Sequence, residues 1–212
     1  MTFEPGEGWD YGCGLDWAGQ MVERVTGSAH LGDYMAENIW KPLGMTSTTF
    51  RLAERPDIAG QLCGMTMRSP AGHLLANPPL PYPVKEPKDD EGGSGAYTTA
   101  PDYLKLLSSL LRNDGKILKP ETVNEMFKPQ LQNPAYLAGV LAIPEFAKCL
   151  VPGMPVGLKW NYGLGGIIVM EEISGRTGKG TMFWGGLPNL YWVRLCPLSN
   201  FFVRLLCWLL TV

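Results

Sequence analysis

The sequence has few of the residues on which metal, disulfide and nucleic-acid chemistry depend. Its two histidines, His30 and His73, stand far apart, so no metal site is indicated and we expect neither a metal nor a cofactor. Its five cysteines are odd in number and form no C-x-x-C pair, which favours reduced thiols in the cytoplasm over a disulfide framework. A net charge of −2 without a cluster of Lys or Arg gives no electrostatic footprint for nucleic acid or an anionic membrane.

Targeting and membrane-spanning patterns are also lacking. The first residues hold no basic start followed by an apolar stretch, so we expect neither a secretory signal nor mitochondrial targeting. The longest apolar stretch, residues 201–212, is interrupted by Arg204 and is shorter than the roughly 20 residues that a membrane span requires. The 212 residues are 45% hydrophobic and 18% charged, which suits a globular protein with a real core. We expect a cytoplasmic protein that acts on small molecules and binds neither nucleic acid nor membranes.

Apolar residues at helical spacing predict that helices come first in the chain. The first predicted helix has an apolar face made of Leu15, Ala18, Met21, Val22 and Val25. Gly27 then follows as a stop signal. The predicted helices run from about Leu15 to Thr26, from His30 to Trp40, from Pro101 to just before Asn113, and from Pro120 onward.

Strand patterns follow in the later part of the chain. Residues 160–170 alternate and become apolar, and residues 181–193 are aromatic and β-branched, so we expect these two segments to pair as a hairpin. Residues 77–95 are rich in Pro, Gly and acidic residues and predict a long surface excursion. The order of elements predicts a mixed α and β protein.

The sequence lacks an activated serine of the kind that acyl transfer requires. Such a serine needs an adjacent base, and a lysine one helical turn later can supply it, but no Ser-x-x-Lys occurs. Ser109 comes nearest, with Arg112 in the lysine position, and arginine stays protonated and cannot act as a base. Ser94 lies in a Gly-rich run without a preceding strand pattern, which turn chemistry explains better than a nucleophile.

Four collinear blocks carry a family resemblance. They are Trp9–Gly12, Ile39–Phe50, Gly92–Leu104 and Lys179–Trp192, and together they cover roughly Phe3 to Val193. The chain resembles the serine β-lactamase, penicillin-binding protein and esterase superfamily. The resemblance implies the C-terminal part of a β-lactamase/transpeptidase-like fold, an antiparallel sheet flanked by helices with a helical subdomain. It also implies a β-lactamase-like portion over 1–193 and a divergent apolar tail over 194–212.

The resemblance gives Tyr11 a catalytic role. Tyr11 stands in a Gly-rich loop before the first helix and is similar to the tyrosine of the family's Tyr-x-Asn segment, which moves protons beside the reactive serine and lysine. A free phenol has a pKa of about 10, so it acts near neutrality only where positive charge favours the phenolate. Cys13 occupies the position of the family's asparagine, where a polar contact with the acyl group is expected. A nucleophilic role for Cys13 competes with inert packing.

The last block implies the substrate-binding strand. Trp184 stands where β-lactamases carry a cationic residue that holds the substrate carboxylate, an interaction that depends on charge-assisted hydrogen bonds. An indole offers apolar area and one N–H donor instead, which favours a neutral ester or thioester. Gly185 and Gly186 are expected to let the strand backbone approach the acyl group, where an N–H group can complete an oxyanion hole. Trp184 also has a purely structural interpretation, as packing between sheet and loop.

The Trp-Gly-Gly form and the following Pro188-Asn189 are similar to esterases of the superfamily and to fungal acyltransferases that esterify polyketides such as statins. The implied function is therefore serine acyltransfer in secondary-metabolite biosynthesis, from a thioester or ester donor to an alcohol acceptor. Two alternatives remain, an esterase of the same family and an inactive fragment with a binding or interaction role. Because both ends look cut, we expect the chain to be inactive alone and to self-associate, and deletion of Arg194 to Val212 to improve its solubility.

Overall fold

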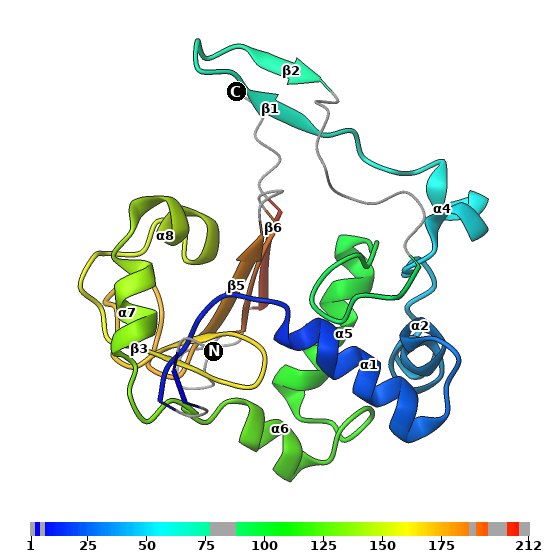
Figure 1. The fold of residues 1–212 in the computed structure, drawn as a ribbon, viewed down its shortest axis with the longest axis horizontal. Coiled ribbons are helices and arrows are strands. Elements are labelled where there is room, and N and C mark those ends of the chain that lie inside the picture. Colours follow the sequence, from blue (N-terminus) through cyan, green and yellow to red (C-terminus); the bar gives the residue numbers. More distant parts are fainter. Residues whose placement is uncertain (1–2, 5–6, 77–87, 187–189, 195–202, 208–212) are drawn as a thin grey trace. The chain divides into compact units, whose positions relative to one another are not determined.

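The computed structural model describes the chain except residues 1–2, 5–6, 77–87, 187–189, 195–202 and 208–212 (Figure 1). The chain divides into two compact units. The first unit comprises Met1–Gly12 and Leu104–Val212, and the second comprises Cys13–Tyr103. The elements are mixed α and β, as the sequence predicted.

The first unit is built on a five-stranded antiparallel sheet. Its strands follow the order β3-β4-β5-β6-β7, so each strand pairs with its neighbour in sequence. The strands are β3 (Trp160–Tyr162), β4 (Ile167–Val169), β5 (Met182–Gly186), β6 (Leu190–Arg194) and β7 (Val203–Cys207). All side chains of β4 are buried, which agrees with the apolar run in the sequence at this point.

Two short helices cover the sheet of the first unit. α7 (Ala135–Leu141) contacts β3, and α8 (Pro144–Leu150) contacts β5 (Figure 1). Between them lies the apolar core, formed by Leu137, Leu141, Leu150, Val151, Trp160, Ile167, Val169 and Phe183. This unit also holds α6 (Pro120–Met126), which begins with a proline. N–H groups in the first turn of a helix have no partner within the helix, so proline, which lacks this group, is tolerated there.

The second unit is mostly helical. α1 (Gly14–Thr26) ends at Gly27, which adopts the left-handed conformation that glycine tolerates best. A continuous helical run follows, made of α2 (Leu31–Met35), the π-helical segment η1 (Ala36–Trp40) and α3 (Lys41–Leu43). The remaining elements are η2 (Leu52–Glu54), α4 (Pro56–Ala59) and the two-stranded hairpin of β1 (Thr66–Arg68) and β2 (Leu74–Ala76). α5 (Ala100–Arg112) begins in this unit and continues into the first.

Two buried aspartates hold the second unit together. Asp90 accepts a hydrogen bond from the backbone N–H of Gly32 at 2.8 Å and forms an ion pair with Arg51 at 3.2 Å. Asp102 accepts from the backbone N–H of Ser47 at 2.7 Å. Both aspartates are almost fully buried, and a buried carboxylate is tolerated only when such partners satisfy it.

The strands differ from the expected hairpin of two long strands. Each of the two predicted segments contains two strands, β3 and β4 in the first and β5 and β6 in the second. Gly163 to Gly166 form the turn between β3 and β4, with Gly165 at a φ of 139° that other residues rarely adopt. The two segments do pair with each other, through β4 and β5, with Ile167 opposite Phe183.

Two further expectations meet the structure only in part. The divergent apolar tail predicted over 194–212 contains, after the end of β6, one regular element among the described residues, β7 (Val203–Cys207), which pairs with β6. The irregular segment predicted over 77–95 lies outside the described residues for 77–87, and residues 88–95 contain neither helix nor strand. Among the helices of the described residues, none combines the length and the apolar character needed to cross a membrane.

Candidate active site

Tyr11 and Trp184 lie against each other in the first unit. Their ring centroids are 6.2 Å apart and their planes are 19° from parallel. The Tyr11 side chain is 64% exposed, and Trp184 is half-buried at the margin of the core. We call this pair of rings the aromatic wall. The Trp184 indole contacts the apolar core, and the Tyr11 phenol faces solvent.

Tyr162 and Trp9 extend this wall. The Tyr162 ring stands edge-on to Trp184, with centroids 5.7 Å apart, and Trp9 packs on Tyr162 at 5.5 Å. Burial, and to a lesser degree the electrostatic effect of Tyr11, raises the pKa of Tyr162 to about 12. Tyr162 is therefore a neutral phenol at physiological pH.

Buried Asn161 fixes the backbone on which Tyr162 stands. The Asn161 side chain accepts from the N–H of Leu131 at 3.0 Å and donates to the Leu131 carbonyl at 3.1 Å. The carbonyl of Tyr162 accepts from the backbone N–H of Gln130 at 2.8 Å. These bonds join β3, the strand that carries Tyr162, to the segment before α7.

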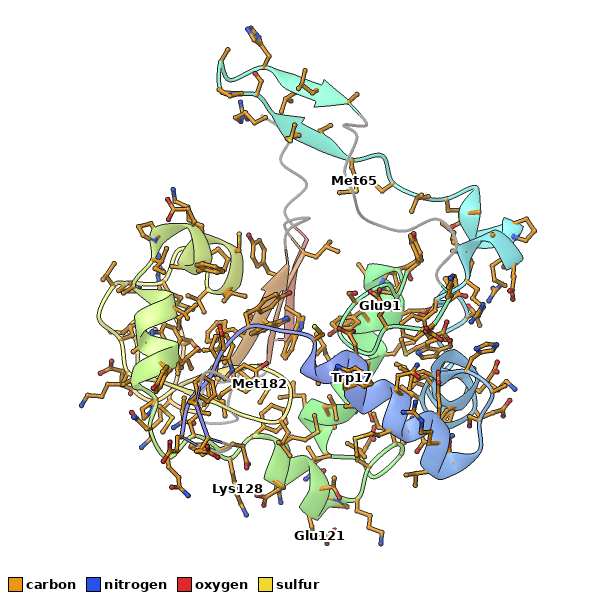
Figure 2. All side chains as sticks on the ribbon, in the orientation of Figure 1. Trp17, Met65, Glu91, Glu121, Lys128 and Met182 are labelled. Carbon is orange, nitrogen blue, oxygen red and sulfur yellow. The ribbon has the colours of Figure 1, made fainter. Side chains whose placement is uncertain are left out.

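The strand β5 extends beyond its neighbour β4. β5 begins at Met182, which is labelled in Figure 2, and pairs with β6 over its whole length. Its described pairing with β4 covers only Met182 and Phe183. Trp184, Gly185 and Gly186 therefore continue the strand past the last β4 partner, and strand backbone in such a position can bind an extended ligand.

Gly185 has a packing role that the sequence did not reveal. A Cβ atom at this position would lie 2.3 Å from the carbonyl oxygen of Cys149 and 2.5 Å from Cδ1 of Tyr191. Tyr191 itself donates a hydrogen bond to the carbonyl of Lys148 at 3.0 Å. The space beside Gly185 is thus filled by the end of α8 and by Tyr191, so the missing side chain lets α8 approach the strand. Gly186 is half-buried and pairs with Leu190.

Cys13 belongs to the second unit and stands directly before α1. Its carbonyl accepts from the N–H groups of Asp16 and Trp17, both at 3.2 Å, but its side chain makes no capping hydrogen bond. The thiol is free and the residue is exposed. The family resemblance implies an asparagine at this position, and an asparagine at a helix start can offer a side-chain oxygen to the backbone N–H groups. The Cys13 thiol makes no such bond.

The other polar groups considered from the sequence have local partners. The hydroxyl of Ser94 bonds to the carboxylate of Glu91, as expected for a residue in a turn. His30 contacts Arg51, with Nδ1 3.0 Å from the guanidinium nitrogen. Within the described ranges, no group of three or more His, Cys, Asp or Glu side chains is placed to share a metal ion.

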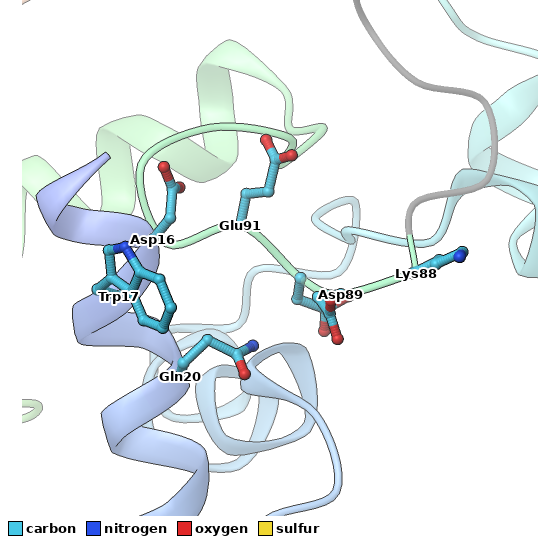
Figure 3. Close-up of a pocket in the computed structure, with 7 residues that line it drawn as sticks. Asp16, Trp17, Gln20, Lys88, Asp89 and Glu91 are labelled. Carbon is cyan, nitrogen blue, oxygen red and sulfur yellow. The ribbon is translucent and has the colours of Figure 1, made fainter. Parts of the chain in front are cut away.

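The second unit has a shallow hollow of about 350 Å³ beside α1. Figure 3 shows Asp16, Trp17 and Gln20 of α1 facing the segment that carries Asp89 and Glu91. The lining combines one exposed indole with several carboxylates. None of the residues that the sequence singled out for acyl chemistry lines this hollow.

The comparison with known proteins decides the family. Residues 1–193 match the Beta-lactamase family. The chain belongs to the beta-lactamase family. The match ends where the sequence predicted the divergent tail to begin, although that division of the chain remains a prediction. The mixed architecture and the antiparallel sheet are those of the family's fold, as solved relatives also indicate.

The chain is similar to fungal acyltransferases and esterases of this family. It is 38% identical to the monacolin J acid methylbutanoyltransferase of Aspergillus terreus over 93% of the chain and 50% of that protein. It is 37% identical to the lovastatin esterase of Penicillium rubens over 91% of the chain and 48% of that protein. The structure of unliganded simvastatin synthase from Aspergillus terreus superposes with a TM-score of 0.82 at 38% identity, covering 90% of this chain and 48% of that one. The chain therefore spans about half the length of the curated relatives it matches.

Sequence reasoning did not identify Trp9 and Tyr162 as neighbours of the predicted site. Trp9 stands two positions before Tyr11 in the same loop, and its aromatic ring was a usable signal. Tyr162 shares a strand with Trp160 and directly precedes the glycine-rich turn. The contact between Tyr162 and Trp184 crosses from β3 to β5, and only the sheet order brings these strands near each other.

Proposed function

We propose that this chain provides the tyrosine and the substrate strand of a serine acyltransferase of secondary-metabolite biosynthesis. The observation that carries the proposal is the stacking of Tyr11 on Trp184 beside the strand end that continues past β4. Tyr11 supplies a phenol for proton transfer, and Trp184 supplies apolar area and one N–H donor. Membership of a family whose named relatives are acyltransferases and esterases supports the same conclusion.

The proposed substrates are a small acyl thioester or ester and an alcohol of polyketide type. A site lined by Trp184, Tyr11 and Tyr162 offers neutral rings, which suits an uncharged acyl chain better than an anionic antibiotic. In the complete reaction a serine oxygen attacks the acyl carbon, the thiol or alcohol of the donor leaves with a proton, and the acceptor alcohol then displaces the serine. Backbone N–H groups at Gly185 or Gly186 are the proposed donors to the acyl oxygen.

The nucleophile of this reaction is not identified among the 212 residues, which contain no Ser-x-x-Lys. We therefore propose that the chain binds acyl compounds but does not turn them over by itself. Cys13 keeps its proposed role as a polar contact at the position of the family's asparagine. We further propose the cytoplasm as its location and small molecules, not nucleic acid or membranes, as its partners.

Two other functions are each favoured by one observation. Hydrolysis in place of transfer is favoured by the similarity to the lovastatin esterase. A binding or interaction role without catalysis is favoured by the lack of the serine–lysine pair. The two reactions can be distinguished in a protein that also contains the nucleophile. If an added alcohol acceptor increases the rate of product release above the rate in water alone, the reaction is transfer; if it does not, the reaction is hydrolysis.

A binding measurement tests the proposed site. The probe is a methylbutyl thioether, in which a methylene group replaces the hydrolysable carbonyl of an acyl thioester, and it is titrated into the full chain by calorimetry. We expect saturable binding that Trp184→Ala weakens about tenfold, equivalent to about 1.4 kcal/mol. Val156→Ala serves as the matched control, because Val156 is 96% exposed. Equal affinity of the wild type, Trp184→Ala and Tyr11→Ala would overturn the proposed site.

A further inference from the structure

The backbone groups of Tyr162 lie on the edge of β3 that faces away from β4. In an antiparallel pair, alternate residues bond to the partner strand, and Lys159 and Gly163, at the two ends of β3, do so. The Lys159 carbonyl accepts from the N–H of Met170 at 2.9 Å, and the Gly163 N–H donates to the carbonyl of Gly166 at 2.8 Å. The N–H and the carbonyl of Tyr162 therefore point to the outer edge. Because β3 comes first in the described strand order, no strand of that sheet lies beside this edge.

The side chain of Asn161 takes the place of a neighbouring strand. Its Oδ1 accepts from the N–H of Tyr162 at 2.8 Å and from the N–H of Leu131 at 3.0 Å. Its Nδ2 donates to the carbonyl of Leu131 at 3.1 Å. The carbonyl of Tyr162 accepts from the backbone N–H of Gln130 at 2.8 Å. Both backbone polar groups of Tyr162 thus have partners, as an accounting of backbone groups requires.

An amide side chain suits the three partners of Asn161. Two of them are N–H donors and one is a carbonyl acceptor, and an amide has an oxygen that can accept twice and a nitrogen that donates. A carboxylate would lack the donor for the Leu131 carbonyl, and an alanine would lack all three bonds. Asn161 is 7% exposed, so water can replace little of what is lost, and an unsatisfied buried group is costly.

The backbone held by Asn161 carries the ring that contacts the aromatic wall. The Tyr162 ring stands edge-on to Trp184 at 5.7 Å and packs on Trp9 at 5.5 Å. Leu131, the second residue bonded to Asn161, packs against the same apolar core as Tyr162 and Trp184. All of these residues belong to the first unit. A shift of the Tyr162 backbone would therefore move a ring that lies directly on Trp184.

We propose that Asn161 is a positioning residue of the candidate acyl site. Its side-chain amide holds the backbone of Tyr162, and the ring of Tyr162 in turn sets the orientation of Trp184 toward an acyl compound. Asn161 does not itself touch the acyl compound in this arrangement. A binding group keeps one orientation when the residues that support it have fixed hydrogen bonds and packing of their own. The inference rests on the proposed function, because it concerns the same site.

Two measurements on the full chain test this role. The first is the affinity for the methylbutyl thioether. The second is near-UV circular dichroism, which reports the fixed packing of aromatic rings. The difference spectrum between a protein and its Trp184→Ala counterpart isolates the contribution of Trp184. We expect Asn161→Ala to weaken thioether binding about fivefold and to remove most of the Trp184 difference signal.

Asn133→Ala is the matched control. Asn133 is exposed, and its side chain accepts from the N–H of Ala135 at 3.1 Å at the start of α7. This change should lower the melting temperature but keep the affinity and the Trp184 signal. Asn161→Gln keeps the amide but moves it by one methylene group, and we expect smaller losses in both measurements. It serves as the second variant if Asn161→Ala does not fold, and far-UV circular dichroism establishes that each variant is folded at the temperature used.

The remaining outcomes separate positioning from stability. A folded Asn161 variant with unchanged affinity and unchanged Trp184 signal overturns the proposal, because Asn161 then contributes stability alone. Loss of only one of the two readouts, or equal losses in Asn133→Ala, overturns it as well. Absence of thioether binding to the wild type overturns the proposed acyl site, whereas the near-UV comparison still decides whether Asn161 orients the rings.

Discussion

The ring of Tyr11 lies nearly parallel to the indole of Trp184, 6.2 Å away, although the two residues stand near opposite ends of the described chain. Segment Met1–Gly12 belongs to the same compact unit as the sheet. The contact therefore joins the loop before α1 to the strand that the sequence indicated as the substrate strand. Both partners lie in a unit with its own apolar core.

A double-mutant cycle should detect this contact. We expect Tyr11→Ala and Trp184→Ala together to destabilise the chain by about 0.5–1.5 kcal/mol less than the sum of the single changes, since stacked aromatic pairs couple by that amount. Urea unfolding provides the measurement. Tyr11→Ala combined with Tyr136→Ala is the control, because the Tyr136 ring packs on Phe3 instead. Additivity of the first pair would show that the rings do not interact in solution.

Activity should be absent from the chain alone. With an activated nitrophenyl ester we expect no stoichiometric burst, because a serine and its lysine act as a unit and the loss of both removes nearly all of their effect. Stopped-flow absorbance and intact-protein mass spectrometry are the measurements. A burst that Cys13→Ala or Ser94→Ala abolishes would identify a substitute nucleophile. A burst that survives both changes contradicts the proposed mechanism.

Gly185→Ala should damage the junction of α8 and β5. The added methyl group meets the Cys149 carbonyl at 2.3 Å, and forced overpacking of this kind costs about 1–3 kcal/mol. Gly139→Ala is the matched control. Gly139 lies inside α7, and a Cβ atom at this position would meet no other atom within 4 Å. We expect that control to stabilise the chain by about 0.5–1 kcal/mol. Equal melting temperatures for both variants would show that α8 does not pack against Gly185.

The tail prediction changes once the strands are known. Deletion of Arg194 to Val212 was expected to improve solubility, but β7 pairs with β6 over Val203–Cys207. Removal of β7 leaves one edge of β6 unpaired, and an open strand edge promotes association. We now expect the chain without residues 195–212 to aggregate more than the chain without residues 208–212, which retains β7. Static light scattering at matched concentrations compares the two, and a monodisperse shorter chain would contradict the role of β7.

The sequence predicted the elements whose signals are local. The helix predicted from Leu15 to Thr26 is present as α1, bounded by Gly27, and Pro120 begins α6. The same local signal was misleading about direction, because the apolar face of α1 faces solvent and its polar face packs. Periodicity reports which residues share a face but not what lies opposite it.

The residues of the candidate site were named only through the family resemblance. The resemblance gave Tyr11 and Trp184 separate roles in two distant blocks, and their rings lie together in the structure. The edge-on contact of Tyr162 depends on the order of the strands, and the packing role of Gly185 depends on where α8 ends. Contacts of this kind join distant parts of the chain, so no local pattern encodes them.

Tyr162 should give the chain a distinct loss of stability at alkaline pH. Its folded-state pKa is raised to about 12, first by burial and then by Tyr11, whereas an unfolded tyrosine has a pKa of about 10. Between these two values the unfolded chain has lost the Tyr162 proton and the folded chain still holds it. The stabilising contribution is therefore fully present below pH 10 and is lost as the pH rises toward 12.

Tyr162→Phe removes this ionisation while it keeps the ring. We expect the free energy of unfolding of the variant to fall less steeply between pH 10 and 12 than that of the wild type, as measured by urea unfolding at successive pH values. Tyr103, whose pKa burial also raises to about 12, keeps its own contribution in both proteins and so leaves a residual slope. Tyr136→Phe is the control at an exposed tyrosine and should leave the slope unchanged. Identical slopes for the wild type and Tyr162→Phe would show that Tyr162 is not buried beside Trp184. The edge-on contact of Tyr162 with Trp184 would then not be part of the site.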